Sequence, residues 1–237
     1  MTDRERCGRL APMRRGVNRT EKLAAAQARR RNVRFRHAFI WLLIGAVIYA
    51  VALAIAILLH PDPKAVLAPV IGPSLYLTPL FGMPYLFASV RQRGWVRRTF
   101  YFGAVLPFAH VVANYLAWRH ASISFALEPD PRAYVEDLGT GAVGGFAGGT
   151  LAFALLVALR LAPLNPGSRA VILLGIAALT ALGALGMAQG LLLTGAHGYQ
   201  LKSAGFVFWL ECVHLPWQVC LAFFLAWLMR LGRRLAG

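Results

Sequence analysis

The chain has 237 residues, of which 58% are hydrophobic and 14% are charged, and its formal net charge is +16. Soluble domains carry about a quarter charged residues, so this composition argues against a soluble protein and favours membrane helices. A basic chain is also typical of nucleic-acid-binding proteins, but most of these cations lie in short segments between apolar runs, so we do not expect a nucleic-acid partner.

The chain begins with a basic tail, residues 1–36, which contains 12 Lys and Arg residues. We expect this tail to be disordered or partly helical and to lie in the cytoplasm. The run RRRNVRFR at residues 29–36 directly precedes the first apolar stretch, as in a retained signal anchor. The tail is therefore expected to set the topology, with anionic lipid as its partner. A shorter basic tail, residues 231–237, closes the chain.

Six apolar stretches are long enough to cross a bilayer, which takes roughly 20 residues of helix. The sequence therefore predicts an all-α, polytopic membrane protein with one transmembrane domain at residues 37–230. Its predicted spans are 37–60, 65–90, 99–118, 138–161, 170–194 and 206–229.

The second predicted span is unusual because it contains Pro69, Pro73, Pro79 and Pro84. An interior proline removes a backbone donor and crowds the preceding turn. We expect this span to be kinked, broken or re-entrant, and to be packed among other helices. Broken helices often line solute paths in transporters, although a kinked structural helix is an open alternative.

The fourth predicted span carries glycines at every fourth position, at Gly141, Gly145 and Gly149. These residues form a smooth helix face that allows another backbone to approach closely. The face predicts tight helix packing and a possible contact for a homo- or hetero-oligomer. The next span is preceded by Asn165-Pro166, a pair that suits an N-cap followed by a first-turn proline.

The distribution of Lys and Arg predicts the orientation. With the amino terminus inside, the inner segments hold 21 of these residues and the outer segments hold 4. Because positive residues are enriched in cytoplasmic loops, six spans with both termini in the cytoplasm are expected. The high Arg and Ala content favours a bacterial inner membrane.

Polar residues inside the spans are the candidate functional residues. Glu211, His214 and Gln218 lie on one stripe of the last span, and Glu211 is the only acid that we place within the bilayer. His110 and Asn114 lie one turn apart in the third span. A rise of about 1.5 Å per residue places the two histidines at nearly the same depth. The two spans are not known from the sequence to be neighbours.

Several interpretations of these residues remain open. In the first, these residues only form hydrogen bonds between helices. In the second, Glu211 and His214 relay protons or cations in a small-solute transporter or in a subunit of one. Alternatively, His110 and His214 ligate haem b in a redox subunit. A metal-dependent enzyme would need more carboxylates than this domain supplies, and a non-catalytic scaffold is a further class. We favour the transporter, with no catalytic residues and no cofactor.

Overall fold

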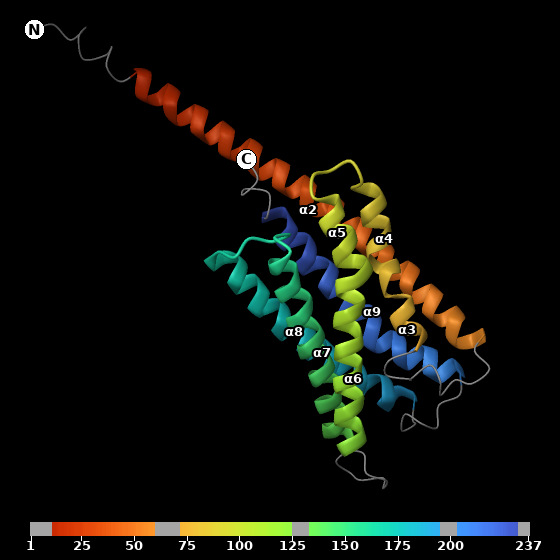
Figure 1. Ribbon diagram of the computed structural model, residues 1–237. Coiled ribbons are helices and arrows are strands. Elements are labelled where there is room, and N and C mark those ends of the chain that lie inside the picture. Colours follow the sequence, from red (N-terminus) through yellow and green to blue (C-terminus); the bar gives the residue numbers. More distant parts are fainter. Residues whose placement is uncertain (1–10, 60–71, 125–132, 195–202, 232–237) are drawn as a thin grey trace, which may run out of the picture.

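The described residues form helices joined by short turns. A computed structural model describes residues 11–59, 72–124, 133–194 and 203–231, which contain no strand (Figure 1). The helices are α2 (Ala11–Leu59), α3 (Pro73–Tyr76), α4 (Thr78–Ala88), α5 (Trp95–Phe100), the π-helical turn η2 (Tyr101–Val105), α6 (Leu106–Ser124), α7 (Ala133–Ala158), α8 (Pro166–Thr194) and α9 (Ser203–Leu231). The all-α prediction is therefore confirmed for the described residues.

In the part of the chain that the structure describes, five helical stretches are long and apolar enough to cross a membrane. They are Leu23–Leu59, Trp95–Ser124, Asp137–Ala158, Pro166–Thr194 and Ala204–Arg230. Large apolar side chains on their outer faces are exposed, among them Val47, Ile55, Phe108 and Leu173. A soluble protein rarely exposes so much contiguous apolar surface, so the prediction of a membrane protein is supported.

The second predicted span, 65–90, is not one continuous helix. Its first part falls outside the described residues, and the rest consists of the short helices α3 and α4, which are separated at Leu77. Pro79 stands in the first turn of α4, where its missing amide hydrogen is tolerated, and Pro84 lies inside that helix. The described part of this span is thus interrupted at Leu77, and which of the three forms the whole span takes stays a prediction.

The helix that contains the first predicted span extends well before the predicted start of that span. The sequence places its start at His37, whereas α2 runs without interruption from Ala11 to Leu59. The amino-terminal part of α2 projects well beyond the other helices (Figure 1). Residues 11–36 of the basic tail are thus helical, because Ala, Arg and Lys are all good helix formers.

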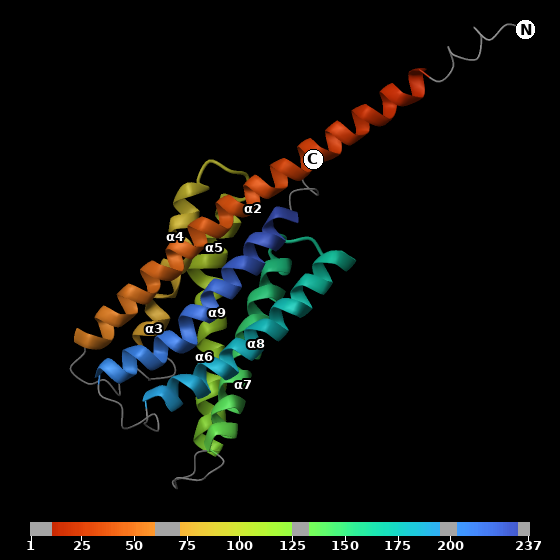
Figure 2. The ribbon, with the colours of Figure 1, turned by 180° about the vertical axis from the view of Figure 1, so that it is seen from behind.

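By their contacts the helices form a closed ring. Figures 1 and 2 show the bundle from opposite sides. Helix α2 packs against α4 and α9, α9 against α8, α8 against α7, and α7 against α6. Contacts of α4 with η2 and α6 close the ring. The interior of this ring is where side chains from helices distant in sequence can meet.

The glycine face of α7 packs against α8 of the same chain. A Cβ atom on Gly141 would collide with the carbonyl oxygen of Gly183, and one on Gly145 with that of Leu179. A Cβ on Gly149 would lie 3.1 Å from the side chain of Leu179. The absence of side chains at these positions is what allows the two backbones to touch. An oligomer contact through α7, which stays a prediction, would have to use a different face.

A π-helical turn interrupts the third span just before Pro107. Because Pro107 has no amide hydrogen, the carbonyl of Gly103 loses the donor four residues further on. In the preceding turn the amide of Leu106 bonds to the carbonyl of Tyr101, five residues back. The Tyr101 hydroxyl donates to the carbonyl of Ala152 over 3.0 Å and so ties this turn to α7. The sequence analysis did not foresee this wider turn.

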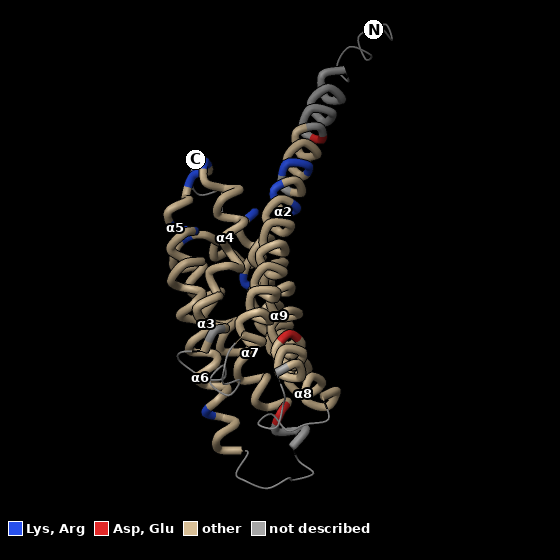
Figure 3. The backbone as a smooth tube through the Cα atoms, turned by 90° about the vertical axis from the view of Figure 1, so that its right-hand side faces the viewer, with Lys and Arg blue, Asp and Glu red and all other residues tan. Residues whose placement is uncertain are grey.

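Positive residues gather at one end of the bundle, as Figure 3 shows. The amino-terminal half of α2, the turn between α4 and α5, and the carboxyl end of α9 all lie there (Figure 1).

At the beginning of α8, the amide of Ser168 donates to the Asn165 side chain over 2.8 Å, which confirms the predicted N-cap.

Candidate functional site

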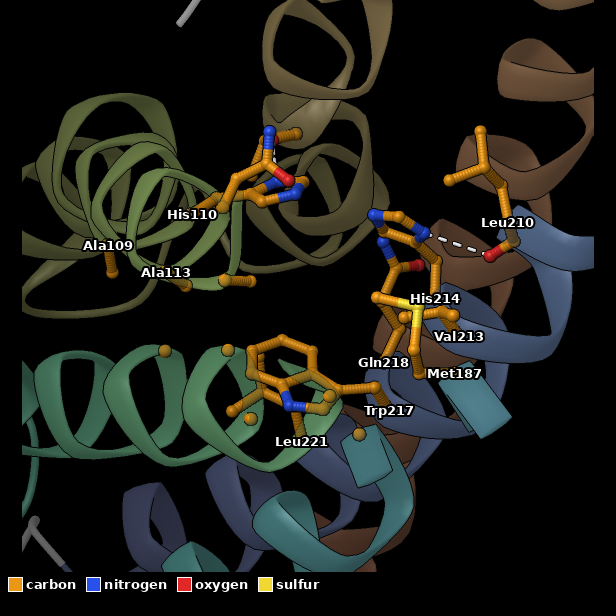
Figure 4. A pocket seen from close by; sticks show the side chains of 18 of the residues that line it. Ala109, His110, Ala113, Met187, Leu210, Val213, His214, Trp217, Gln218 and Leu221 are labelled. Carbon is orange, nitrogen blue, oxygen red and sulfur yellow. Dashed lines mark hydrogen bonds between the residues drawn. The ribbon is translucent and has the colours of Figure 1, made fainter. Parts of the chain in front are cut away.

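A cavity of about 140 Å³ lies within the helix ring, between α6, α7 and α9 (Figure 4). Much of its wall is apolar or glycine, including the inner edge of the α7 glycine face. The polar side chains that line it are Thr78, His110, Asn114, Thr140, His214 and Gln218. Four of the five predicted relay residues therefore meet at one cavity, and Glu211 does not line it.

His110 is held by a hydrogen-bond chain from the interrupted second span. The hydroxyl of Thr78 lies 2.7 Å from His110 Nδ1 and donates to the carbonyl oxygen of Ser74 over 3.0 Å. The Thr78 hydroxyl has one hydrogen, which it donates to the Ser74 carbonyl oxygen. The bond to His110 is then donated by the Nδ1–H of His110 and accepted by the Thr78 oxygen. His110 Nε2 then carries a lone pair.

A hydrogen bond to the backbone of its own helix fixes the orientation of the His214 ring. Its Nδ1 lies 2.9 Å from the carbonyl oxygen of Leu210, which can only accept, so Nδ1 carries the hydrogen and Nε2 a lone pair. The ring centroids of His110 and His214 lie 5.4 Å apart, and Figure 4 shows a nitrogen of each ring directed toward the other. Two acceptor nitrogens that face each other favour a proton, a cation or a donor molecule between them.

Gln218 adds a buried amide group to the wall of the cavity. Its side chain is 5% exposed, and its Oε1 has no hydrogen-bond partner within the described residues. A buried acceptor without a partner costs about 1–3 kcal/mol. Figure 4 shows the Gln218 side chain beside His214. Together these groups form a small site that suits a hydrogen-bond donor or a cation.

Glu211 lies one turn before His214, and the residue as a whole is half-buried. Both carboxyl oxygens are buried, and neither has a hydrogen-bond partner among the residues that the structure describes. The hydroxyl of the fully buried Tyr49 donates instead to the Ser74 carbonyl over 3.0 Å, while its ring lies 6.0 Å from that of His214. An intramembrane acid in this situation is a functional-site candidate by default.

Thr78 is the site residue that the sequence analysis missed. It orients His110 from α4, a helix that is separate in sequence from all the predicted site residues. The available signal was its position directly before Pro79, in a span already marked as broken. Broken helices often place polar groups at intramembrane sites.

The haem alternative, with His110 and His214 as ligands, stays a prediction, and the size of the cavity is an argument against it. A cavity of about 140 Å³ resembles engineered cavities of about 150 Å³ that hold one benzene molecule. A porphyrin, with four pyrrole rings, does not fit between His110 and His214 at this ring separation. A group of three or more His, Cys, Asp or Glu residues placed to hold a metal ion is also not found in the described part of the chain.

Comparison of the chain with models of known protein families, with curated proteins and with solved structures finds no match. The arguments for function therefore come from the residues and their geometry.

Proposed function

We propose that this chain transports a small solute together with protons or cations across a bacterial inner membrane, either alone or as a subunit of a transporter. The observation that carries the proposal is the cavity within the helix ring, where His110, His214, Asn114 and Gln218 meet. Transporters typically bind their substrates and coupling ions at such intramembrane sites, beside broken helices.

The histidine pair is the proposed site of the coupling ion. A proton or cation that enters between the two Nε2 atoms gains two acceptors, while the Nδ1 hydrogen bonds to Thr78 and Leu210 keep both rings in position. Glu211 is the proposed second proton carrier, because its carboxyl group is buried one turn away on the same helix. Transfer between these groups would accompany movement of the solute.

The proposed topology has six crossings with both termini in the cytoplasm. In Figure 1 the chain leaves α2 at one end of the bundle, and α3 and α4 lead back to the other end, where α5 begins. The arginines of the α4–α5 turn then lie on the same side as the basic half of α2, as positive-inside asymmetry requires. The broken α3–α4 element would thus act as a crossing.

The function can be tested by measuring proton flux into proteoliposomes loaded with a pH-sensitive dye. We expect His214→Ala to lower the flux by about tenfold or more, because one of two facing acceptors is lost. Ser122→Ala is the control, since the exposed Ser122 hydroxyl donates only to the Arg119 carbonyl, over 2.8 Å, and neither residue lines the cavity. Equal flux in wild-type protein, both variants and empty liposomes would refute transport of protons.

A further inference from the structure

A second, larger cavity of about 1090 Å³ lies at the arginine-rich end of the molecule. Residues from α2, the α4–α5 turn, α5, the end of α7 and the end of α9 line it. Six arginines contribute to its wall, namely Arg34, Arg93, Arg97, Arg98, Arg160 and Arg230. Among the described residues none with a carboxylate lines this cavity, so nothing in its wall balances these charges.

Two of these arginines are held in place by contacts within the protein, Arg98 as a buried residue and Arg230 as a half-buried one. Arg98 is 5% exposed and donates through Nη2 to the carbonyl oxygens of Ser89 and Gln92, at 3.4 and 3.1 Å. Its Nε is buried without a hydrogen-bond partner in the described residues, and so is that of Arg230. The Arg230 guanidinium lies 4.3 Å from the ring centroid of Trp227, which holds it in place.

Arg160 occupies a backbone position that arginine seldom takes. Its φ of 56° makes it the one non-glycine residue with positive φ in the described ranges. This left-handed conformation just after a helix usually belongs to glycine, because a Cβ atom is strained there. Arg160 is exposed at this point and lines the cavity.

We propose that this cavity binds a phosphate-bearing anion through its arginines. The planar guanidinium group pairs with phosphate oxygens through two parallel hydrogen bonds, and a ring of such groups without carboxylates selects for negative charge. The positive-inside rule accounts for positive residues at this end of the chain. It does not require six arginines to line one cavity that no carboxylate of the described residues lines. This proposal does not depend on the transport proposal.

The phosphate comes either from an anionic phospholipid headgroup or from a soluble molecule. A headgroup is the better fit, because in the proposed orientation the cavity opens where helices emerge on the cytoplasmic side, and basic pockets at that level bind anionic lipids. The two sources differ in their tests. Phosphatidylglycerol would bind from mixed micelles, whereas a soluble ligand site would respond to inorganic phosphate or pyrophosphate alone.

The experiment measures binding of phosphatidylglycerol to the full-length protein, with phosphatidylcholine as the neutral reference. The test variant is the double change Arg93→Gln and Arg97→Gln, since both side chains are exposed and line the cavity. The matched control is Arg36→Gln with Arg169→Gln, which removes two exposed charges that do not line it. We expect about tenfold or greater weakening in the test variant and less than threefold in the control.

Each result of this experiment either supports or overturns the proposed anion site. Selective weakening in the test variant supports a lipid site, and displacement of the lipid by millimolar pyrophosphate assigns the same arginines to a soluble anion. Equal weakening in both variants means general surface attraction and overturns the proposal. If the test variant does not fold, native mass spectrometry of the wild-type protein provides the result. Retention of phosphatidylglycerol over phosphatidylcholine supports the site, and equal retention overturns it.

Discussion

Replacement of Gly145 by leucine tests the packing of α7 on α8. A Cβ atom at this position already meets the Leu179 carbonyl oxygen, and backbone cannot rotate away as a side chain can. We therefore take the upper end of the usual overpacking cost, about 3 kcal/mol. The better helix propensity of leucine returns about 1 kcal/mol. The net loss of about 2 kcal/mol corresponds to a fall in Tm of about 4–8 °C for a chain of this size.

The assay is thermal unfolding of the purified protein in detergent. The control is Ala154→Leu, which adds a side chain of the same size on the exposed face of α7 and should change Tm by less than about 2 °C. A Gly145→Leu protein with the Tm of the control would refute the close approach of the two backbones. It would also remove the basis for the geometry of the cavity, whose wall includes Gly145.

Two further predictions concern topology and cofactor content. A reporter fused after Gly167 should lie on the cytoplasmic side, since four crossings precede it in the proposed topology, and a signal from the opposite side would contradict six crossings. Protein purified from haem-sufficient cells should show no Soret band, because the cavity between His110 and His214 holds about 140 Å³. A Soret band that disappears in His110→Ala would show that haem does bind there.

The sequence was most informative where a single helix determines the answer. The spacing of Gly141, Gly145 and Gly149 predicts a smooth face on α7, but only the folded chain shows that α8 covers it. Counting the helical rise places His110 and His214 at one depth, and their rings do lie 5.4 Å apart. Depth follows from position along one helix, whereas the choice of neighbours depends on how all the helices pack together.

The parts that could not be predicted depend on contacts between segments far apart in the chain. Thr78 orients His110 across 32 positions, and no local pattern marks such a pair. The arginine cavity has the same character, because Arg34, Arg98, Arg160 and Arg230 come from four separate elements. Each appears in the sequence as an ordinary topology signal, and the cavity exists only when the helix ends come together.

The measurement that tests the proposed function most directly is proton flux in proteoliposomes containing Glu211→Gln. The amide keeps the size of the carboxyl group but cannot release a proton. We predict that this variant keeps the wild-type Tm in detergent, because a buried acid without a hydrogen-bond partner in the described residues contributes little to the fold. We also predict that it loses coupled proton flux, because the amide cannot carry the proton. A Glu211→Gln protein with wild-type stability and unchanged flux would contradict the proton role of Glu211.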